Sequence, residues 1–436
     1  MRWIDLHDVG WGECIVLGGD RGGILMVDCG SSNLRLGEDG PGFYEYVTDS
    51  IIPRYFEAEN RSFFLTHCHR DHLCGLWRIL ETAPGYFGSL YLPVPPCGED
   101  GRPLLLEFAL DVSVFLSRLT GYAQVNAAVL TLFTRAARLA GAGAVFPVRE
   151  GDGFLFDGTE YEVIWPPETG FPYPGELSAA VEEIDAMLSA PLLPPCAREF
   201  LGLRERFCAA YRLMVSSAPV REEEAEETRE LYERIRALVP DLLLLPCAGA
   251  AADLLAAGKT REAYSGALNA ACAVFQNVRR GGPGQDDILM TGDATPESLL
   301  AASARMYDGY AVLKAPHHGT AGYFFPLEVA ADHILISNGP YQGGGEIASR
   351  YAELPAVRHC TGNAACSYLK EHGSCCNRLA LCGLPSGGAV LPVRCPAASR
   401  SGAAAPCRVR VLSGKKNASC LCDAVRSKNF MAPAEF

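Results

Sequence analysis

The chain has 436 residues, of which 49% are apolar, and a formal net charge of −13. A chain this long and this apolar can bury a large core, which excludes a disordered protein. Residues 371–436 carry nine Lys or Arg and three Asp or Glu, so residues 1–370 hold 29 basic and 48 acidic residues, a charge of −19. An acidic body of this kind argues against broad, phosphate-driven binding of nucleic acid.

No targeting segment is expected at the N-terminus. Residues 1–5 run directly into a predicted strand with no cleavable signal before it, so we expect a cytoplasmic protein. The most apolar stretch, around residues 238–257, is interrupted by prolines and aspartates. A membrane span is therefore not expected.

The most informative segment is the run His-Cys-His-Arg-Asp-His at residues 67–72, because it places three of the nine histidines within six positions. A short apolar strand is predicted immediately before it. Side chains two apart in an extended segment point the same way, so His67 and His69 can bind one metal ion. Helical spacing begins at Asp71, which puts Asp71 and His72 at a strand-to-helix turn where they can reach a second ion.

Two later segments supply what a two-metal site still lacks. A strand predicted over residues 287–291 is followed closely by Asp293, whose carboxylate is the candidate bridging ligand. A second apolar strand, residues 310–315, runs into His317 and His318, one of which should close the second metal site. Imidazole and carboxylate ligands suit zinc, so we expect two zinc ions, with manganese or iron as alternatives.

These candidate groups all follow predicted strands. Another strand, predicted over residues 22–29, contains Asp28 near its end, where a carboxylate can orient a metal ligand from behind. Ligands of open α/β sheets generally bind at the carboxyl ends of strands. The sequence therefore predicts an α/β fold with one site at that edge.

Outside the motifs, the sequence predicts helical insertions in one large domain and a C-terminal tail. Helical spacing predicts insertions at about residues 104–140 and 175–259, which we expect to shape the substrate pocket. One large domain is predicted over residues 1–370. Residues 371–436 form a basic, Cys-rich tail whose Pro, Ser, Gly and Ala content favours flexibility. The eighteen cysteines of the chain are expected to be reduced thiols.

The order of His67, His69, Asp71 and His72, followed by a later aspartate and a terminal histidine, resembles the signature of the metallo-β-lactamase superfamily. More closely, the sequence resembles the hydrolase domain of the ComEC competence proteins and their soluble relatives. The similar segments are spread over about residues 3–368 and comprise residues 6–13, 150–152, 163–167, 269, 290–293, 314–320 and 336–339. The resemblance implies a four-layered αβ/βα sandwich, here with helical insertions, and metal ions at one edge.

The chain also departs from the family pattern. Many members of the superfamily have one more histidine before the bridging aspartate, but this chain has none between His72 and His317. The first metal ion must then take His67, His69, Asp293 and water, or recruit a carboxylate or a thiol. In the opening motif, glutamate 13 stands where the relatives usually have aspartate.

The resemblance implies a metal-dependent hydrolase, most closely a phosphodiesterase or nuclease-like enzyme, that attacks a small-molecule or nucleic-acid phosphodiester with a metal-bound hydroxide. Asp71 would ligate the second ion and accept a proton, and His318 is the preferred ligand of its pair. His317 would face the substrate or donate to the leaving group. Lys314 either assists an anionic substrate or is an exposed lysine at a strand end. The alternatives are a carboxylic ester, lactone or amide hydrolase with the same centre, and a binding protein without turnover.

Overall fold

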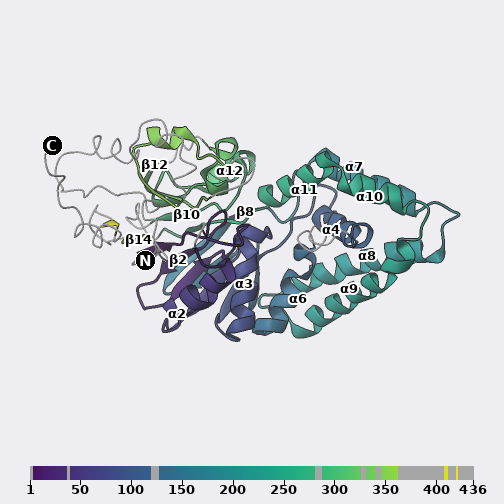
Figure 1. Cartoon of the computed structure of the whole chain (residues 1–436), viewed down its shortest axis with the longest axis horizontal. Helices are drawn as coiled ribbons and strands as arrows, with labels where there is room; N and C mark the ends of the chain where they lie inside the picture. The colour runs from purple at the N-terminus through teal and green to yellow at the C-terminus, as the bar shows by residue number, and fades with distance from the viewer. Residues whose placement is uncertain are drawn as a thin grey trace.

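The computed structural model describes residues 3–36, 40–118, 127–279, 287–325, 330–339, 345–361, 407–410 and 419–420. The protein is an α/β structure with two mixed β-sheets and a lobe of helices beside them (Figure 1). The α/β class expected from the sequence is therefore confirmed.

The first sheet contains the N-terminal strands and two short strands from near the C-terminus. In spatial order its strands are β15 (Ser419–Cys420), β14 (Cys407–Arg410), β1 (Trp3–Leu6), β2 (Ile15–Gly18), β3 (Ile24–Val27), β4 (Arg61–Phe64), β5 (Ser89–Pro93) and β6 (Val145–Val148). Neighbours from β3 to β6 are parallel, and β14 pairs with β1 in antiparallel register.

The strands β14 and β15 fall within residues 371–436, where the sequence predicted only a flexible tail. Pairing between the two ends of a chain depends on tertiary contacts and leaves no local pattern in the sequence. The rest of that predicted tail lies outside the described residues.

The second sheet holds the remaining strands. Their order is β13 (Val357–Cys360), β12 (Ala330–Ile336), β11 (Gly309–Lys314), β10 (Ile288–Met290), β9 (Val274–Asn277), β8 (Thr159–Trp165) and β7 (Gly153–Phe156). Strands β10 to β13 are parallel neighbours, whereas β7, β8, β9 and β10 pair in antiparallel fashion.

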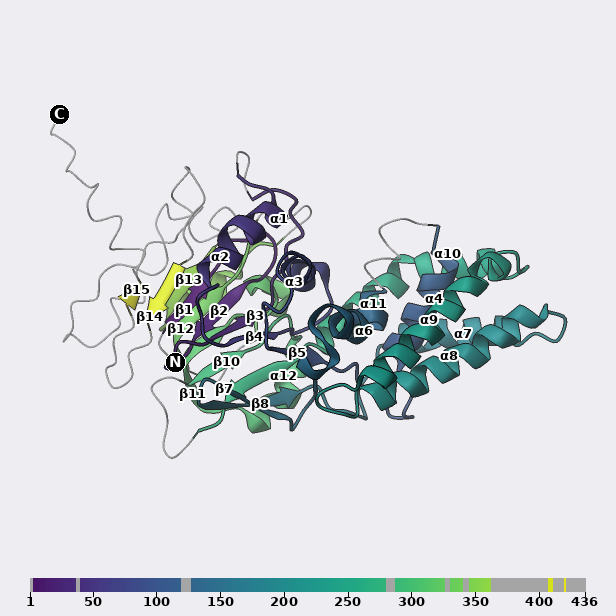
Figure 2. The same ribbon diagram turned by 90° about the horizontal axis from the view of Figure 1, so that it is seen from below.

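The helices fall into two groups. Those beside the sheets are α1 (Phe43–Tyr46), α2 (Ile52–Arg54), α3 (Arg70–Thr82) and α12 (Pro296–Ala302), and those of the helical lobe are α4 (Leu104–Phe115), α6 (Ala128–Ala140), α7 (Gly175–Leu188), α8 (Pro195–Met214), α9 (Glu222–Leu242), α10 (Ala248–Ala256) and α11 (Gly258–Ala270). Figure 2 shows this lobe extending away from the sheets. It occupies both predicted insertions and continues past residue 259 to Ala270. None of the helices in the described ranges combines the length and apolar character needed to cross a bilayer.

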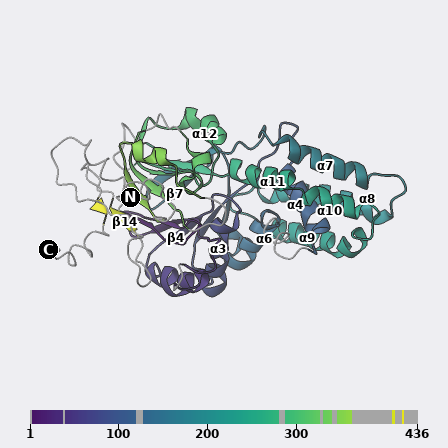
Figure 3. The same cartoon turned by 45° about the horizontal axis from the view of Figure 1, so that its top comes forward.

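The two sheets pack face to face because adjacent residues of each strand point to opposite sides. Phe64 of β4 joins an apolar cluster that also contains Phe275 of β9, so this cluster lies between the sheets. Phe63, one residue earlier, joins a second cluster that contains Leu76 of α3. Figure 3 shows α3 and α12 on opposite sides of the paired sheets. The arrangement is consistent with a sandwich whose outer faces are covered by helices.

The carboxyl ends of β4 and β10 lie next to each other even though they belong to different sheets. Ala273, just before β9, donates its backbone N–H to the carbonyl of Thr66 after β4, at 2.8 Å. His317, after β11, donates its backbone N–H to the carbonyl of Gly292, at 3.1 Å. The loops that follow the three strands are therefore bonded together. Their side chains form the candidate site.

Candidate metal centre

A cluster of imidazoles and carboxylates lies where β4, β10 and β11 end. The loop after β4 carries His67 and His69, and the first turn of α3 carries Asp71 and His72. Asp293 follows β10. The 3-10 helix His317–Gly319 follows β11 and carries both histidines of the later motif. The residues singled out in the sequence as metal ligands are therefore brought together in space, although among the described residues His69 belongs to no group of three ligand atoms close enough to hold one ion.

The ring nitrogens of the cluster point at one another and at the same carboxylates. His67 Nε2 lies 2.9 Å from His69 Nδ1. His72 Nε2 lies 3.2 Å from Asp293 Oδ2, and His318 Nε2 lies 3.4 Å from that same oxygen. Asp293 thus stands between the two halves of the cluster, as a bridging ligand requires.

The groups of ligand atoms that are close enough to hold one ion overlap. Within the described residues they are His67 with His72 and Asp293, Asp71 with His72 and His318, Glu13 with Asp28 and His72, and Glu13 with Asp293 and His318. Three of these groups share His72, and two share Asp293. The overlap suits neighbouring ions better than a single isolated one.

Each of three histidines is oriented by a hydrogen bond on the side of the ring that faces away from the cluster. His72 Nδ1 lies 2.7 Å from Asp28 Oδ2, and His318 Nδ1 lies 2.9 Å from the carbonyl of Ser337. A carbonyl only accepts, so His318 keeps a proton on Nδ1 and, in its neutral form, presents the Nε2 lone pair to the cluster. Asp28 orients His72 in the same way, which is the role expected for it from the sequence.

His67 is also oriented through Nδ1, in this case by the Thr66 hydroxyl, which links it to Asp28. Thr66 donates its hydroxyl to Asp28 Oδ2 at 2.6 Å, and its oxygen lies 3.2 Å from His67 Nδ1. Because the Thr66 hydrogen is already used, His67 must donate from Nδ1, which leaves Nε2 as a lone pair. Asp28 therefore fixes two imidazoles at once, one directly and one through Thr66.

The unpaired atoms of the cluster test whether metal ions fit it. His72 Nε2, His318 Nε2 and Asp293 Oδ1 are buried and have no hydrogen-bond partner. Buried polar atoms without partners are rare in native proteins and require an explanation. Three such atoms on neighbouring imidazole and carboxylate groups are the donor set of a divalent cation, so the residues present fit the ions expected from the sequence.

Protonation equilibria in the metal-free cluster show where positive charge is favoured. Burial opposes protonation of His318, but the adjacent Asp293 and Asp71 outweigh it and raise its pKa to about 9. Burial likewise disfavours the charged form of Asp71, but His318 and His72 hold its pKa below the ordinary value. A cation can take the place of those protons.

His317 behaves differently from its neighbour. Burial lowers the pKa of His317 to about 4, so the ring is neutral near pH 7. Its Nδ1 lies 2.9 Å from Thr320 Oγ1, and Thr320 donates its own hydrogen to the His317 carbonyl at 3.0 Å. His317 therefore donates from Nδ1, and its Nε2 lies 3.9 Å from Asp293 Oδ2 as an acceptor.

The backbone around the cluster is strained in a way that brings these groups together. Asp28, His317 and His318 have φ values of 55°, 44° and 57°, in the left-handed region that non-glycine residues seldom adopt. Gly292 has a φ of 49°, and a Cβ there would lie 2.4 Å from the sulfur of Cys272. Such outliers gather where a site requires them.

The interpretations of Lys314 as a substrate-binding or an exposed lysine are both wrong. Lys314 is fully buried behind the cluster, and its Nζ pairs with Glu13 Oε2 at 2.6 Å. The ammonium also donates to the carbonyls of Gly292 and Ala315, at 3.2 Å and 2.8 Å. Lys314 cannot reach a substrate, because it faces the interior of the fold.

The thiols near the cluster are also placed away from the converging nitrogen and oxygen atoms. Cys272 Sγ lies 3.8 Å from His67 Nδ1, which is the nitrogen on the far side of the ring, and accepts the backbone N–H of Asp293 at 3.2 Å. No cysteine of the described residues belongs to a group able to hold an ion, and the described cysteines are free thiols. The absent third histidine is therefore not replaced by sulfur in this part of the chain.

Ser265 and Tyr323 near the cluster were missed by reasoning from motifs, whereas residue 269 was noted only as a point of family resemblance, with no role assigned to it. Ser265 and Asn269 belong to α11 of the helical lobe, and Ser265 Oγ lies 3.3 Å from His69 Nε2. Tyr323 stacks on His317, with ring centroids 3.7 Å apart and planes 10° apart. Helical spacing predicted α11 but gave no sign that its last turns reach the metal ligands.

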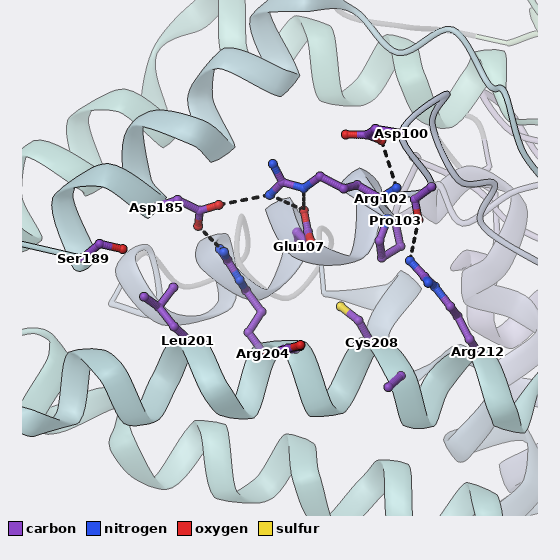
Figure 4. Close-up of a pocket in the computed structure, with 13 residues that line it drawn as sticks. Asp100, Arg102, Pro103, Glu107, Asp185, Ser189, Leu201, Arg204, Cys208 and Arg212 are labelled. Atoms are coloured by element: carbon purple, nitrogen blue, oxygen red, sulfur yellow. Dashed lines mark hydrogen bonds and ion pairs between the residues drawn. The ribbon is translucent and has the colours of Figure 1, made fainter.

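A separate pocket of about 540 Å³ lies in the helical lobe, lined by residues of α4, α7 and α8 and the segment before α4 (Figure 4). Arg204 donates to both carboxylate oxygens of Asp111, at 3.0 and 3.1 Å, and also pairs with Asp185. Arg102 donates to Glu107 at 3.1 Å and to Asp185 at 3.0 Å. Carboxylates engage the guanidinium groups of Arg102 and Arg204, and Arg212 donates to the carbonyl of Gly101, so the pocket is bordered by a structural network of ion pairs and hydrogen bonds.

No protein-family model matches this chain, and no curated protein matches it.

Proposed function

We propose that this protein is a metal-dependent hydrolase of the metallo-β-lactamase superfamily, with the four-layered αβ/βα sandwich of that family and a ComEC-like site, and that it cleaves phosphodiesters. One observation carries the proposal. His67, His72 and His318 are each anchored through Nδ1, so that their Nε2 atoms converge around Asp293. Imidazoles oriented in this way are typical of metal ligands.

The charge of the buried centre supports two ions. Four carboxylates, those of Glu13, Asp28, Asp71 and Asp293, face one ammonium, that of Lys314. With neutral imidazoles, the centre carries three negative charges in excess, and uncompensated buried charge is strongly unfavourable. Two divalent cations would turn this excess into a single positive charge. A net positive charge favours an anionic phosphodiester over a neutral ester, lactone or amide.

Zinc is the ion that this nitrogen and oxygen donor set suits best, with manganese or iron as alternatives. When bound, such ions activate water and stabilise the negative charge that develops on the substrate oxygen. Asp71, with Oδ2 at 3.5 Å from His318 Nε2, is positioned to hold the second ion and to accept a proton. His317 offers Nε2 as an acceptor first and can then return the proton to the leaving group.

The proposal is tested by metal analysis combined with hydrolysis assays. The purified protein would be loaded with zinc or manganese, freed of excess metal and assayed on bis-p-nitrophenyl phosphate, on nucleic acid and on a panel of lactones. We expect about two ions per chain and phosphodiester turnover that Asp71→Ala reduces at least a hundredfold. Asp308→Ala, an exposed aspartate outside the cluster, is the matched control and should retain full turnover.

The outcomes separate the alternatives. Lactone turnover without phosphodiester turnover would replace the proposed substrate class while keeping the metal chemistry. Metal binding with no turnover on any substrate of the panel would favour a binding protein. A protein that takes up no metal after reconstitution would overturn both enzymatic functions.

A further inference from the structure

Beside the candidate metal centre, a hydrogen bond joins two elements that lie far apart in the sequence. Asn269, in the last turn of α11, donates from Nδ2 to the hydroxyl oxygen of Tyr323 at 3.0 Å. Tyr323 ends the 3-10 helix Ala321–Tyr323, shortly after the His317 and His318 pair. The contact joins the helical lobe to the loop after β11, on the side of the cluster where His69 and His317 lie.

Tyr323 is held in place by more than this bond. Its ring lies almost parallel to that of His317, and the edge of Trp11 contacts the same imidazole with ring centroids 6.3 Å apart. His317 is therefore enclosed by aromatic rings, and its Nε2 faces Asp293. The position of the Tyr323 hydroxyl beside the cluster is consequently fixed by stacking as well as by Asn269.

Two polar groups of this contact are left for a ligand. Because the oxygen of Tyr323 accepts from Asn269, its hydrogen is free to donate, and no acceptor for it occurs among the described residues. Asn269 is 4% exposed, and its Oδ1 is buried and makes no well-aligned hydrogen bond, with the His69 ring as its nearest polar neighbour. One free donor and one orphaned acceptor side by side, next to a metal cluster, form a recognition site for an anionic oxygen with a neighbouring O–H or N–H group.

We propose that Tyr323, positioned by Asn269, donates a hydrogen bond to a phosphoryl oxygen of the substrate, while Asn269 Oδ1 accepts from a hydroxyl or N–H next to the scissile phosphate. This inference rests on the proposed phosphodiesterase function and deepens it. The substrate class becomes a phosphodiester that carries a hydrogen-bond donor beside the reacting group. Tyr323 is then a substrate-contacting residue, and Asn269 acts both on Tyr323 and on the substrate.

The test uses the full chain loaded with zinc and freed of excess metal, with inorganic phosphate as the binding probe. Metal content would be measured first, and we expect Tyr323→Phe to hold as much metal as the wild type, since the phenol is not a ligand. Phosphate binding by calorimetry should weaken roughly tenfold in Tyr323→Phe, as expected for a lost hydrogen bond to a charged group. Tyr44→Phe removes a phenol outside the cluster and should bind phosphate as the wild type does.

A second variant tests Asn269 and guards against misfolding of the first. Asn269→Ser should retain metal, since the amide is not a ligand, and should weaken phosphate binding less than Tyr323→Phe does, because stacking on His317 still holds the phenol. It should lose preference for a ribonucleotide dimer, which has a hydroxyl beside the phosphodiester, over the matching deoxyribonucleotide dimer. Equal phosphate affinity of Tyr323→Phe and the wild type would overturn the assignment of Tyr323. An unchanged preference in Asn269→Ser would overturn that of Asn269.

These results can be told apart from failure of the proposed function. If the metal-loaded wild type binds phosphate but hydrolyses no phosphodiester, only the proposed function fails, and the comparison of affinities still decides the role of Tyr323. If the metal-loaded wild type binds no phosphate, the inference itself is overturned. Where turnover is measured, a loss in kcat/KM that appears mainly as a higher KM supports substrate contact by Tyr323.

Discussion

The buried pair of Glu13 and Lys314 connects the two halves of the candidate metal centre. Glu13 donates its backbone N–H to the carbonyl of Asp71, at 2.9 Å, and its side chain pairs with Lys314. Lys314 in turn donates to the carbonyl of Gly292, the residue before Asp293. Both side chains are fully buried. The pair therefore ties the strand end that carries the bridging carboxylate to the turn that carries Asp71.

Removing the Lys314 ammonium from this pair should destabilise the fold strongly. Lys314→Met leaves the Glu13 carboxylate buried without its partner, and such a loss typically costs about 3–5 kcal/mol. Urea unfolding measures the free energy directly. The double variant Glu13→Gln with Lys314→Met should recover part of the loss, because no isolated charge remains. Lys259→Met, at an exposed position of α11, serves as the control. A urea midpoint for Lys314→Met equal to that of the wild type would contradict the structural role.

The ligand residues could be predicted from the sequence because their spacing is local. His67, His69, Asp71 and His72 lie within six positions, and their geometry follows from a strand, a loop and one helical turn. Asn269 and Tyr323 could not be predicted in the same way. They contact each other only because α11 and the loop after β11 meet in space, and neither segment has a periodic pattern that reports the meeting.

At the scale of the element, α8 carries a buried charge that its hydrophobic spacing does not reveal. Arg204 lies on the inner face of α8 and binds Asp111 of α4, a carboxylate that is fully buried. Asp185 of α7 pairs with the same guanidinium. The three helices are thus joined by ion pairs in addition to apolar packing, and the network fixes their relative positions.

Breaking this network should weaken the helical lobe. Arg204→Met keeps much of the side-chain volume but leaves the Asp111 carboxylate buried without its charge partner. We therefore expect a loss of about 3–5 kcal/mol in the free energy of unfolding. Arg198→Met, on the exposed face of α8, is the matched control and should change little. Urea or thermal unfolding gives both values. If the two variants lose equal stability, the ion pairs contribute nothing beyond ordinary packing.

The contact between β12 and the edge strand β13 makes the free energy of unfolding depend on pH. His333 of β12 lies 3.0 Å from His359 of β13, measured from Nδ1 to Nε2, and burial lowers the pKa of His333 to about 4. The unfolded chain takes up its proton near pH 6.5 and the folded chain near pH 4. The unfolded state therefore binds more protons between these values, and stability falls as the pH falls through that window.

His333→Gln should remove that dependence. As the pH falls from about 7.5 to about 5, the free energy of unfolding of the wild type should decrease by roughly 2 kcal/mol more than that of the variant. His317, whose pKa is also lowered to about 4, remains in both proteins and cancels in the comparison. Urea unfolding at a series of pH values measures the two slopes. Parallel slopes would show that His333 does not couple proton binding to folding.

The elements were more predictable than their arrangement. The strands expected before residue 67 and at residues 287–291 and 310–315 are present as β4, β10 and β11, because short apolar runs between turns identify buried strands. The helical insertions are present because their spacing repeats every three to four residues. Which strands pair, and that β14 adds to β1, depends on contacts between distant segments. No local pattern encodes those contacts.

At the scale of the whole molecule, the fold concentrates negative charge in its interior as well as on its surface. The chain carries a net charge of −13, and three buried carboxylates, the partly buried Asp71 and a single buried ammonium lie at the junction of the two sheets. In the absence of cations, protons on His72 and His318 must neutralise part of this charge, which is why the pKa of each is raised above its ordinary value. The folded protein is then expected to bind divalent cations that the unfolded chain does not.

Metal binding should therefore raise the stability of the whole protein by linkage. A cation present at a hundred times its dissociation constant adds about 2.7 kcal/mol per site to the free energy of unfolding. The temperature of unfolding should rise when zinc is added to metal-free protein and fall again with a chelator. Asp293→Asn loses the shared carboxylate oxygens and should show little of this rise, whereas Asp308→Asn, at an exposed position, should show all of it. If zinc raises the unfolding temperature of Asp293→Asn as much as that of the wild type, the stabilising ions bind elsewhere, and the cluster after β4, β10 and β11 is not the metal centre.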